Sequence, residues 1–235
     1  MDSGWQEWPR AASAAGTLDT IAEMVSKPKR ADAARNRERV LDAARAVFAE
    51  RGTDASVPDI AERAGVGVAT IYRSFPTKRD LVVAIVLERF RAMKDFAEAA
   101  LAADRDPWDA FATVLISSAR MQLQDRAFGQ VMAEAFDVAE VRAERDQVLD
   151  RIGELMRRAQ DAGAMRRDVV AEDLPCLLSG LSGSLSMADR SSDFWQRHIA
   201  IVLDGLRADG AHPLPSGAPD RAALERLAAA KRRAC

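Results

Sequence analysis

The sequence has few of the residues that carry covalent or metal chemistry. Its 235 residues include two cysteines, two histidines and one tyrosine. Cys176 and Cys235 are too few for a disulfide framework or a metal cluster, so we expect no metal and no cofactor. His198 and His212 have no Ser, Asp or Cys partner that we can assign, and the sequence contains no Gly-rich phosphate loop. We therefore do not expect an enzyme or any catalytic residue.

Long apolar runs and a large net charge are also missing. No stretch is apolar for long enough to span a bilayer, and the first residues, with Asp2 and Glu7, do not form a signal peptide. We therefore expect a cytoplasmic protein without a membrane partner. The net charge is −2, but residues 27–80 hold twelve Lys and Arg against eight Asp and Glu. Such a local basic surplus suits contact with phosphates.

Hydrophobic residues make up 48% of the chain, enough for a sizeable core. They recur at helical spacing, and no alternating strand pattern occurs, so we expect an all-α fold. Beyond the first hundred residues, this spacing predicts further helices. They cover residues 78–101, from 107 onward, 128–136, 141–162, 171–187 and 193–208.

Residues 56–75 predict two short helices joined by a tight corner. Ser56 suits the N-cap of the first helix, and Gly65 suits its C-terminal end, because glycine readily adopts the left-handed conformation found there. The second helix covers about residues 67–74 and ends before Pro76. One face of the pair is apolar and is expected to be buried: Ile60, Ala61, Ala64, Val68, Ile71 and Phe75. This pattern is typical of a helix-turn-helix.

The open face of the second helix carries small and polar side chains, which suit the major groove of DNA: Ala69, Thr70, Tyr72 and Arg73. The alternative is a helical corner with no ligand. The flanks favour DNA, because an apolar stripe over residues 40–48 supplies a third helix. Downstream, Thr77 caps a helix that begins at Lys78. A lysine at a helix start opposes the macrodipole, and a nearby phosphate would make it favourable.

Residues from about 33 to 93 resemble the DNA-binding domain of the TetR family of bacterial transcriptional repressors. The matching elements have fixed spacing: Ala43-Ala44…Val47-Phe48…Gly52, Ser56…Ile60-Ala61…Ala64-Gly65-Val66, and Thr70-Ile71-Tyr72…Phe75…Lys78…Leu81. Gly67 and Ser74 depart from the family pattern, which commonly has Ser at the first position and an aromatic residue or His at the second. The resemblance implies contacts to double-stranded DNA from Ser56, Gly67, Val68, Ala69, Thr70, Tyr72, Arg73 and Lys78.

The resemblance also divides the chain. Residues 31–92 are expected to form the DNA-binding domain, and residues 93–210 a helical domain for dimerisation and effector binding. Residues 1–30 are read as a disordered leader with a basic arm at its end, although the spacing of Leu18, Ile21, Ala22 and Val25 allows an extra helix. Residues 211–235, which start with a Pro-rich linker, are expected to be a flexible tail.

Glycines and serines interrupt the leucines of residues 174–187. Glycine inside a helix costs about 1 kcal/mol relative to alanine, and close approach of another helix would offset that cost. In the TetR family, the last two helices pair with those of a second subunit, so a homodimer on a palindromic operator is implied. The alternative is close packing within one subunit. The expected interface is Leu177, Leu181, Leu185, Trp195, Ile199, Val202 and Leu206.

The family resemblance further implies a small-molecule effector of unknown identity, bound in a cavity of the body. We expect the protein to be a repressor that the effector releases from its operator by tilting the helix that starts at Lys78. The alternative is a DNA-binding architectural or interaction module whose body binds a protein partner and no small ligand. A helical domain whose interior is filled by its own side chains, with no cavity, would favour that alternative. The expected lining is apolar: Phe111, Leu115, Phe128, Met132 and Met156.

Overall fold

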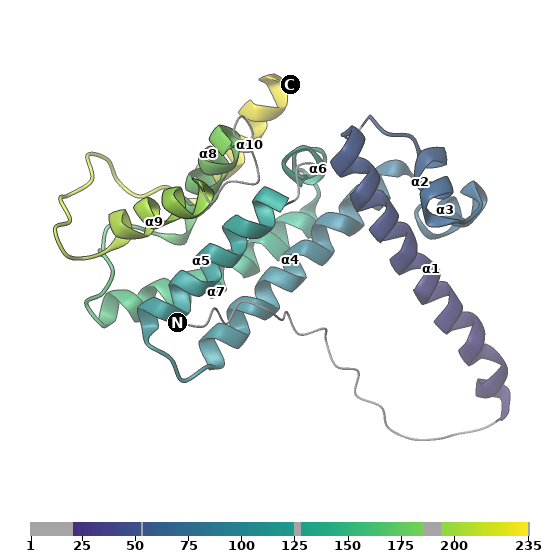
Figure 1. The fold of residues 1–235 in the computed structure, drawn as a ribbon, viewed down its shortest axis with the longest axis horizontal. Helices are drawn as coiled ribbons and strands as arrows, with labels where there is room; N and C mark the ends of the chain where they lie inside the picture. The colour runs from purple at the N-terminus through teal and green to yellow at the C-terminus, as the bar shows by residue number, and fades with distance from the viewer. Residues whose placement is uncertain (1–20, 53, 125–127, 186–193, 235) are drawn as a thin grey trace.

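The computed structural model describes residues 21–52, 54–124, 128–185 and 194–234. Over these ranges the chain is built of helices and contains no strand, which confirms the predicted all-α class (Figure 1). The elements are α1 (Ile21–Arg51), α2 (Val57–Ala64), α3 (Val68–Ser74), α4 (Lys78–Ala102), α5 (Pro107–Gln124), α6 (Phe128–Ala135), α7 (Ala139–Asp161), the short 3-10 helix η1 (Ala171–Asp173), α8 (Leu174–Leu185), α9 (Phe194–Leu206) and α10 (Arg221–Ala234).

The head consists of α1, α2, α3 and the first turns of α4. Its boundaries follow local signals in the sequence. Ser56 and Thr77 each cap the helix that follows them, and each forms a reciprocal capping box with the carboxylate three residues later. Gly65 has φ of +62° and ends α2, as expected for a left-handed C-terminal residue. The apolar faces of the helices meet in one core: Val40, Ala44, Val47, Phe48, Ile60, Ala61, Ile71, Phe75 and Leu81.

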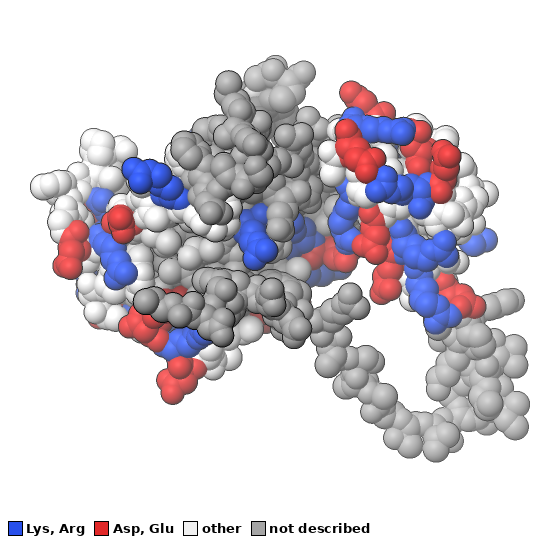
Figure 2. Space-filling model, viewed as in Figure 1, with Lys and Arg blue, Asp and Glu red and all other residues white. Residues whose placement is uncertain are grey.

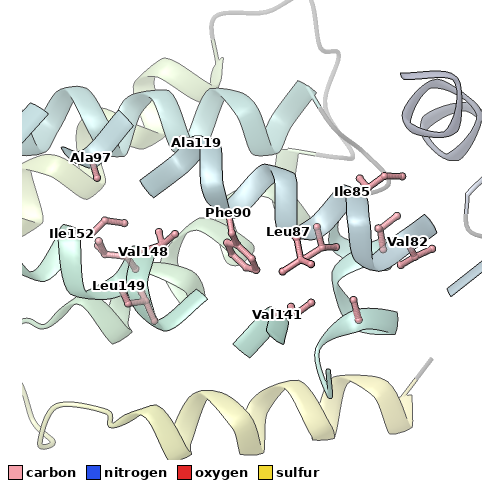
Figure 3. Close-up of a cluster of buried hydrophobic side chains, with 14 of the residues drawn as sticks. Val82, Ile85, Leu87, Phe90, Ala97, Ala119, Val141, Val148, Leu149 and Ile152 are labelled. Carbon is pink, nitrogen blue, oxygen red and sulfur yellow. The ribbon is translucent and has the colours of Figure 1, made fainter. Parts of the chain in front are cut away.

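The body is organised around α4, which leaves the head and continues between the other helices (Figure 1). It packs against α5, α6 and α7, and α8 and α9 lie on the far side of this group. Figure 3 shows the core between α4 and α7, where Phe90 of α4 lies close to Val148 of α7. This packing fixes the direction of α4, because its apolar residues are buried along most of its length.

The first helix is longer than expected. The structure continues α1 back to Ile21, so residues 21–30 are helical where the sequence predicts part of a disordered leader. The spacing of Ile21, Ala22 and Val25 had indicated this alternative. The side chains of residues 21–31, including those of the predicted basic arm, and the whole of residues 1–20 lie outside the described part of the chain.

The C-terminal segment also differs from the expectation of a flexible tail. Residues 221–234 form α10, whose Leu224 is buried against the body. Arg221 lies between three carboxylates, with Nη1 3.2 Å from Asp146, Nη2 2.8 Å from Asp150 and Nε 2.6 Å from Glu172. The weak amphipathic pattern of this segment was visible in the sequence, but the carboxylates that bind it come from α7 and η1.

Candidate DNA-binding surface and effector cavity

The helix α3 turns one face inward and leaves the other open. Ile71 and Phe75 are buried, whereas Ala69, Tyr72 and Arg73 are exposed. Tyr72 has 46% of its surface exposed, unusually much for a large aromatic residue. The open side of α3 is therefore available to a ligand outside the molecule.

Two residues at the start of α3 occupy intermediate positions. Val68 and Thr70 are half-buried, and Val68 packs against the head core. Gly67 is the N-cap of α3 and forms no side-chain cap. Among the described residues, a Cβ atom at this position would meet only the Thr70 hydroxyl, at 4.0 Å. The approach to the start of α3 is thus unobstructed.

Ser56 lies at the start of α2, exposed beside Asp59. Its hydroxyl donates to the Asp59 carboxylate at 2.6 Å, and the Ser56 backbone N–H donates to the same oxygen at 3.0 Å. These hydrogen bonds, assisted by Arg51 at 2.9 Å, lower the pKa of Asp59 below its ordinary value. The side chain of Ser56 is therefore engaged in a helix cap, which holds its hydroxyl at the edge of the head.

Lys78 is half-buried at the first turn of α4, with its Nζ 5.9 Å from the centre of the Phe48 ring. The next residue, Arg79, pairs with Asp137 at 2.6 Å, in the segment between α6 and α7. The first turn of α4 is therefore held by the head on one side and by the body on the other.

Two arginines of α1, which were not among the expected site residues, bind the helix-turn-helix from the side opposite its exposed face. Arg39 Nη2 donates to the carbonyl oxygen of Ala64, the last residue of α2, at 2.6 Å. Arg37 Nη1 donates to the carbonyl oxygen of Ser74 at 3.5 Å, and its guanidinium lies 4.3 Å from the centre of the Phe75 ring. Both bind orphan carbonyls at helix C-termini. The run of arginines at 35–39 was a visible signal, but its partners depend on the tertiary fold.

Charge on the head is mixed. Figure 2 shows Lys and Arg side chains lying beside Asp and Glu side chains over the head, on the right of the view. Several are paired, including Arg63 with Glu50 at 2.8 Å and Arg45 with Glu88 at 2.6 Å. Binding to nucleic acid would thus depend on particular positions rather than on a uniformly basic surface.

The body contains a cavity of about 520 Å³, within the usual range of small-molecule sites. It lies among α4, α5, α6, α7, α8 and α10. Its wall is mostly apolar, with five polar or charged residues and one thiol. The lining residues are Arg89, Phe90, Met93, Phe111, Val114, Leu115, Ser118, Gln122, Met132, Phe136, Arg145, Val148, Leu149, Ile152, Leu174, Pro175, Cys176, Leu178, Ser179, Leu224 and Leu227.

The expected lining residues fall into three groups. Phe111, Leu115 and Met132 line the cavity. Met156 does not, and this prediction needs correction. It lies one turn beyond Ile152, the last lining residue of α7, and is buried in the core with 2% of its surface exposed. Phe128 begins α6, but its side chain lies outside the described residues. The missed lining residues include Leu224 and Leu227, because α10 was expected to be a flexible tail.

The expected dimer-interface residues also differ in their exposure. Ile199 and Leu206 are buried in the core of their own chain, so they offer little surface to a second copy, and their assignment needs correction. A helical apolar stripe cannot distinguish the two kinds of burial. Leu177 is 39% exposed on α8, and Trp195 and Val202 are half-buried on α9. The side chains of Leu181 and Leu185 lie outside the described residues.

The structure adds an exposed residue to this surface. Ile201 of α9 is 56% exposed, and it was not among the expected interface residues. Among the residues that the structure describes, nothing lies within 4 Å of a Cβ atom added at Gly180 or Gly205. The outer faces of α8 and α9 therefore combine exposed apolar side chains with glycines that have free space above them.

None of the helices in the described ranges has the length and apolar character needed to cross a membrane.

Comparison with known proteins assigns both parts of the chain. Residues 40–85 match the family described as bacterial regulatory proteins, tetR family, and residues 106–208 match the C-terminal domain described as transcriptional regulator SbtR-like. The first match covers the end of α1, all of α2 and α3, and the start of α4. The second covers α5 to α9.

Similar individual proteins agree with this assignment. The HTH-type transcriptional repressor KstR of Rhodococcus jostii is 31% identical over 71% of this chain and 72% of its own length. The HTH-type transcriptional regulator UidR of Escherichia coli is 29% identical over 73% of this chain and 89% of its own length. A crystal structure of a TetR transcription regulatory protein from Mycobacterium vanbaalenii is 34% identical, with a TM-score of 0.57, over 77% of this chain and 99% of that one. The chain therefore belongs to the TetR family and is a DNA-binding transcriptional regulator.

Proposed function

We propose that this regulator is a homodimeric repressor that a small molecule releases from a palindromic operator. The observation that carries this proposal is the course of α4. The helix begins at Lys78 in the head and lines the cavity with Arg89, Phe90 and Met93. A change in cavity occupancy thus acts on the same rigid element that supports the DNA-binding head. The name of the similar KstR protein, a repressor, supports repression as the output.

The proposed DNA contacts come from the exposed face of α3 and its surroundings. Thr70, Tyr72 and Lys78 would contact phosphates and groove edges, and Ser56 would act at the start of α2. Sequence preference would come from the rest of α3 and its N-cap: Gly67, Val68, Ala69 and Arg73. The exposure of Tyr72 and Arg73 supports this assignment, because base and phosphate contacts require side chains that leave the protein surface.

A dimer would bring two such heads to successive major grooves, whose centres are about 34–36 Å apart. The proposed interface is the outer face of α8 and α9, where Leu177 and Ile201 are exposed. Gly180 and Gly205 would allow the helices of the second subunit to approach closely, because no described residue of the same chain lies within 4 Å of an added Cβ atom. Such contacts would bury apolar side chains that a monomer leaves in water. A regulator that binds an operator would act in the cytoplasm.

Release by a ligand requires that the ligand bind one position of α4 more tightly than another. The Arg79–Asp137 ion pair supports such coupling, because it joins the first turn of α4 to the segment after α6, and Met132 of α6 lines the cavity. The cavity volume favours a small-molecule effector over the alternative, in which the helical domain binds a protein partner and no small ligand.

The proposal can be tested by capturing the DNA that the protein binds. Purified protein is mixed with fragmented genomic DNA of its source organism, and the retained fragments are sequenced and compared. We expect a palindrome whose half-sites lie one helical turn or a multiple of it apart, and a dimer by sedimentation equilibrium. Extracts of small metabolites should lower operator affinity. Random DNA fragments, or an affinity that only protein extracts change, would contradict the proposal.

A further inference from the structure

The charged residues of the cavity wall have one sign. Among the described residues that line it, two are arginines, Arg89 and Arg145, and none is an aspartate or glutamate. The remaining polar groups are the hydroxyls of Ser118 and Ser179, the amide of Gln122 and the thiol of Cys176. An apolar cavity with cationic and no anionic side chains favours a ligand that combines an apolar body with an acidic group.

Arg145 is placed to receive such a group. Its side chain is 7% exposed, although arginine is among the residues least often buried. Nε and Nη2 donate to Asp146 Oδ1 at 3.0 and 2.7 Å, and Nη2 lies 3.9 Å from Glu225. Nη1 is buried and has no hydrogen-bond partner among the described residues. A buried donor left without an acceptor is costly, so a carboxylate bound close to this guanidinium would be favourable.

The surroundings of Arg145 keep its guanidinium in place. Its Cζ lies 4.9 Å from the centre of the Phe136 ring, which also lines the cavity. Asp146, which holds the opposite edge of the guanidinium, also accepts from Arg221 of α10 at 3.2 Å. The guanidinium of Arg145 is thus held by the Phe136 ring and the Asp146 carboxylate. Nη1 is the nitrogen to which these partners offer no acceptor.

We propose that the effector is an apolar monocarboxylate whose carboxylate pairs with the Arg145 guanidinium, while its body lies against Phe111, Leu115 and Ile152. This inference rests on the proposed function, since it takes the cavity to be the effector site. It adds the chemical class of the effector and the residue that selects for it. A neutral ligand of the same length would fill the apolar part but would not bring the anionic acceptor.

The test compares dodecanoic acid with dodecanol, which share an alkyl chain and differ in the head group. Binding is measured by displacement of the neutral dye Nile red from the full-length protein. We expect the acid to bind about tenfold to a hundredfold more tightly than the alcohol, as for one hydrogen bond between charged groups. Equal affinities in the wild type, or failure of the acid to displace the dye, would overturn the inference.

Variants then assign the preference to Arg145. Arg145→Gln should abolish the preference while leaving dodecanol affinity unchanged, and Arg145→Lys should keep part of it. The matched control is Arg151→Gln on the same helix, where the arginine is half-exposed and pairs with Glu98 at 3.0 Å. A preference that persists in Arg145→Gln would reject the assignment. Because operator binding by the ligand-free protein is measured separately, failure here is distinguishable from failure of the proposed function.

Discussion

Arg39 Nη2 donates to the carbonyl oxygen of Ala64 at 2.6 Å, and so ties the middle of α1 to the C-terminal end of α2. The contact lies behind the helix-turn-helix corner, next to Gly65, where a Cβ atom would come within 3.1 Å of the same nitrogen. The corner therefore depends on a small residue and a cation that fit each other closely.

Replacing Arg39 by Ala should loosen this corner. We expect the free energy of unfolding to fall by about 1 kcal/mol, because a partly exposed hydrogen bond from a charged donor is lost. Chemical denaturation followed by circular dichroism measures the change. The matched control is Arg35→Ala, which removes an exposed pair with Asp32 within α1 and should change stability by less than about 0.5 kcal/mol. Equal effects of the two variants would argue against a special role for Arg39.

Replacing Tyr72 by Ala should weaken operator binding by at least about tenfold, the equivalent of one good polar contact. Tyr72 is 46% exposed and outside the head core, so the thermal melting of the protein should change little. Fluorescence anisotropy with the operator measures the affinity. Tyr72→Phe separates the hydroxyl from the ring. An unchanged affinity in Tyr72→Ala would remove this face of α3 from the interface.

Lys78→Gln should flatten the salt dependence of operator binding. Each neutralised phosphate contributes about 0.9 to the slope of log affinity against log salt, so the slope should fall by about that amount for each subunit. Titrations at several salt concentrations give the slope. Arg151→Gln, which removes a cation from the body, should leave it unchanged. A slope identical to that of the wild type would place Lys78 outside the phosphate contacts.

The carboxylate of Asp168 accepts hydrogen bonds that should weaken at low pH. Arg166 donates to its carboxylate at 2.6 and 2.9 Å, and the Leu214 backbone N–H donates at 3.1 Å. The hydrogen bond from Arg166 holds the pKa of Asp168 far below its ordinary value. A carboxyl with a lowered pKa in the folded state stabilises the protein above its unfolded pKa, and this contribution is lost as the pH falls.

Asp168→Asn should therefore lower the melting temperature at neutral pH, and the gap to the wild type should narrow as the pH falls below about 4. Differential scanning fluorimetry across this range measures both. Asp104→Asn, at an exposed loop position, controls for the loss of one negative charge. A gap that is constant with pH would show that the carboxylate charge at position 168 is not involved.

Arg221→Ala should release α10 from the body, since Arg221 contacts Asp146, Asp150 and Glu172 together. We expect chymotrypsin to cleave at Leu224 and Leu227 about tenfold faster, because the protease acts on the transiently detached helix. Mass spectrometry of the products gives the rate. The control is Arg226→Ala, whose side chain is 72% exposed and 3.9 Å from Asp220. Similar cleavage rates in both variants would contradict the role of Arg221 in holding α10 against the body.

The head could be predicted from the sequence because its boundaries are set locally. Ser56, Gly65 and Pro76 each act on the backbone within a few residues, so the start, corner and end of the helix-turn-helix are readable without knowledge of the fold. The outward face of α3 follows from the same helical period, because burial of Ile71 and Phe75 leaves Tyr72 exposed.

The body could be predicted only in part, because its features arise between distant segments. Ile199 has the spacing of an interface residue, yet it is buried within its own chain. The docking of α10 depends on Arg221 meeting carboxylates 49 to 75 positions away in the sequence. Periodicity shows which face of a helix is apolar and does not identify the surface that covers it.

The unbroken course of α4 has a geometric consequence. Twelve positions separate Lys78 from Phe90, and at 1.5 Å per residue this is a rigid arm of about 18 Å. A rotation of about 5° around the cavity end would displace the first turn by about 1.5 Å, half the length of a hydrogen bond. In a symmetric dimer the displacements of the two heads would add. A small rotation of α4 at the cavity would therefore be enough to move both heads out of register with their grooves.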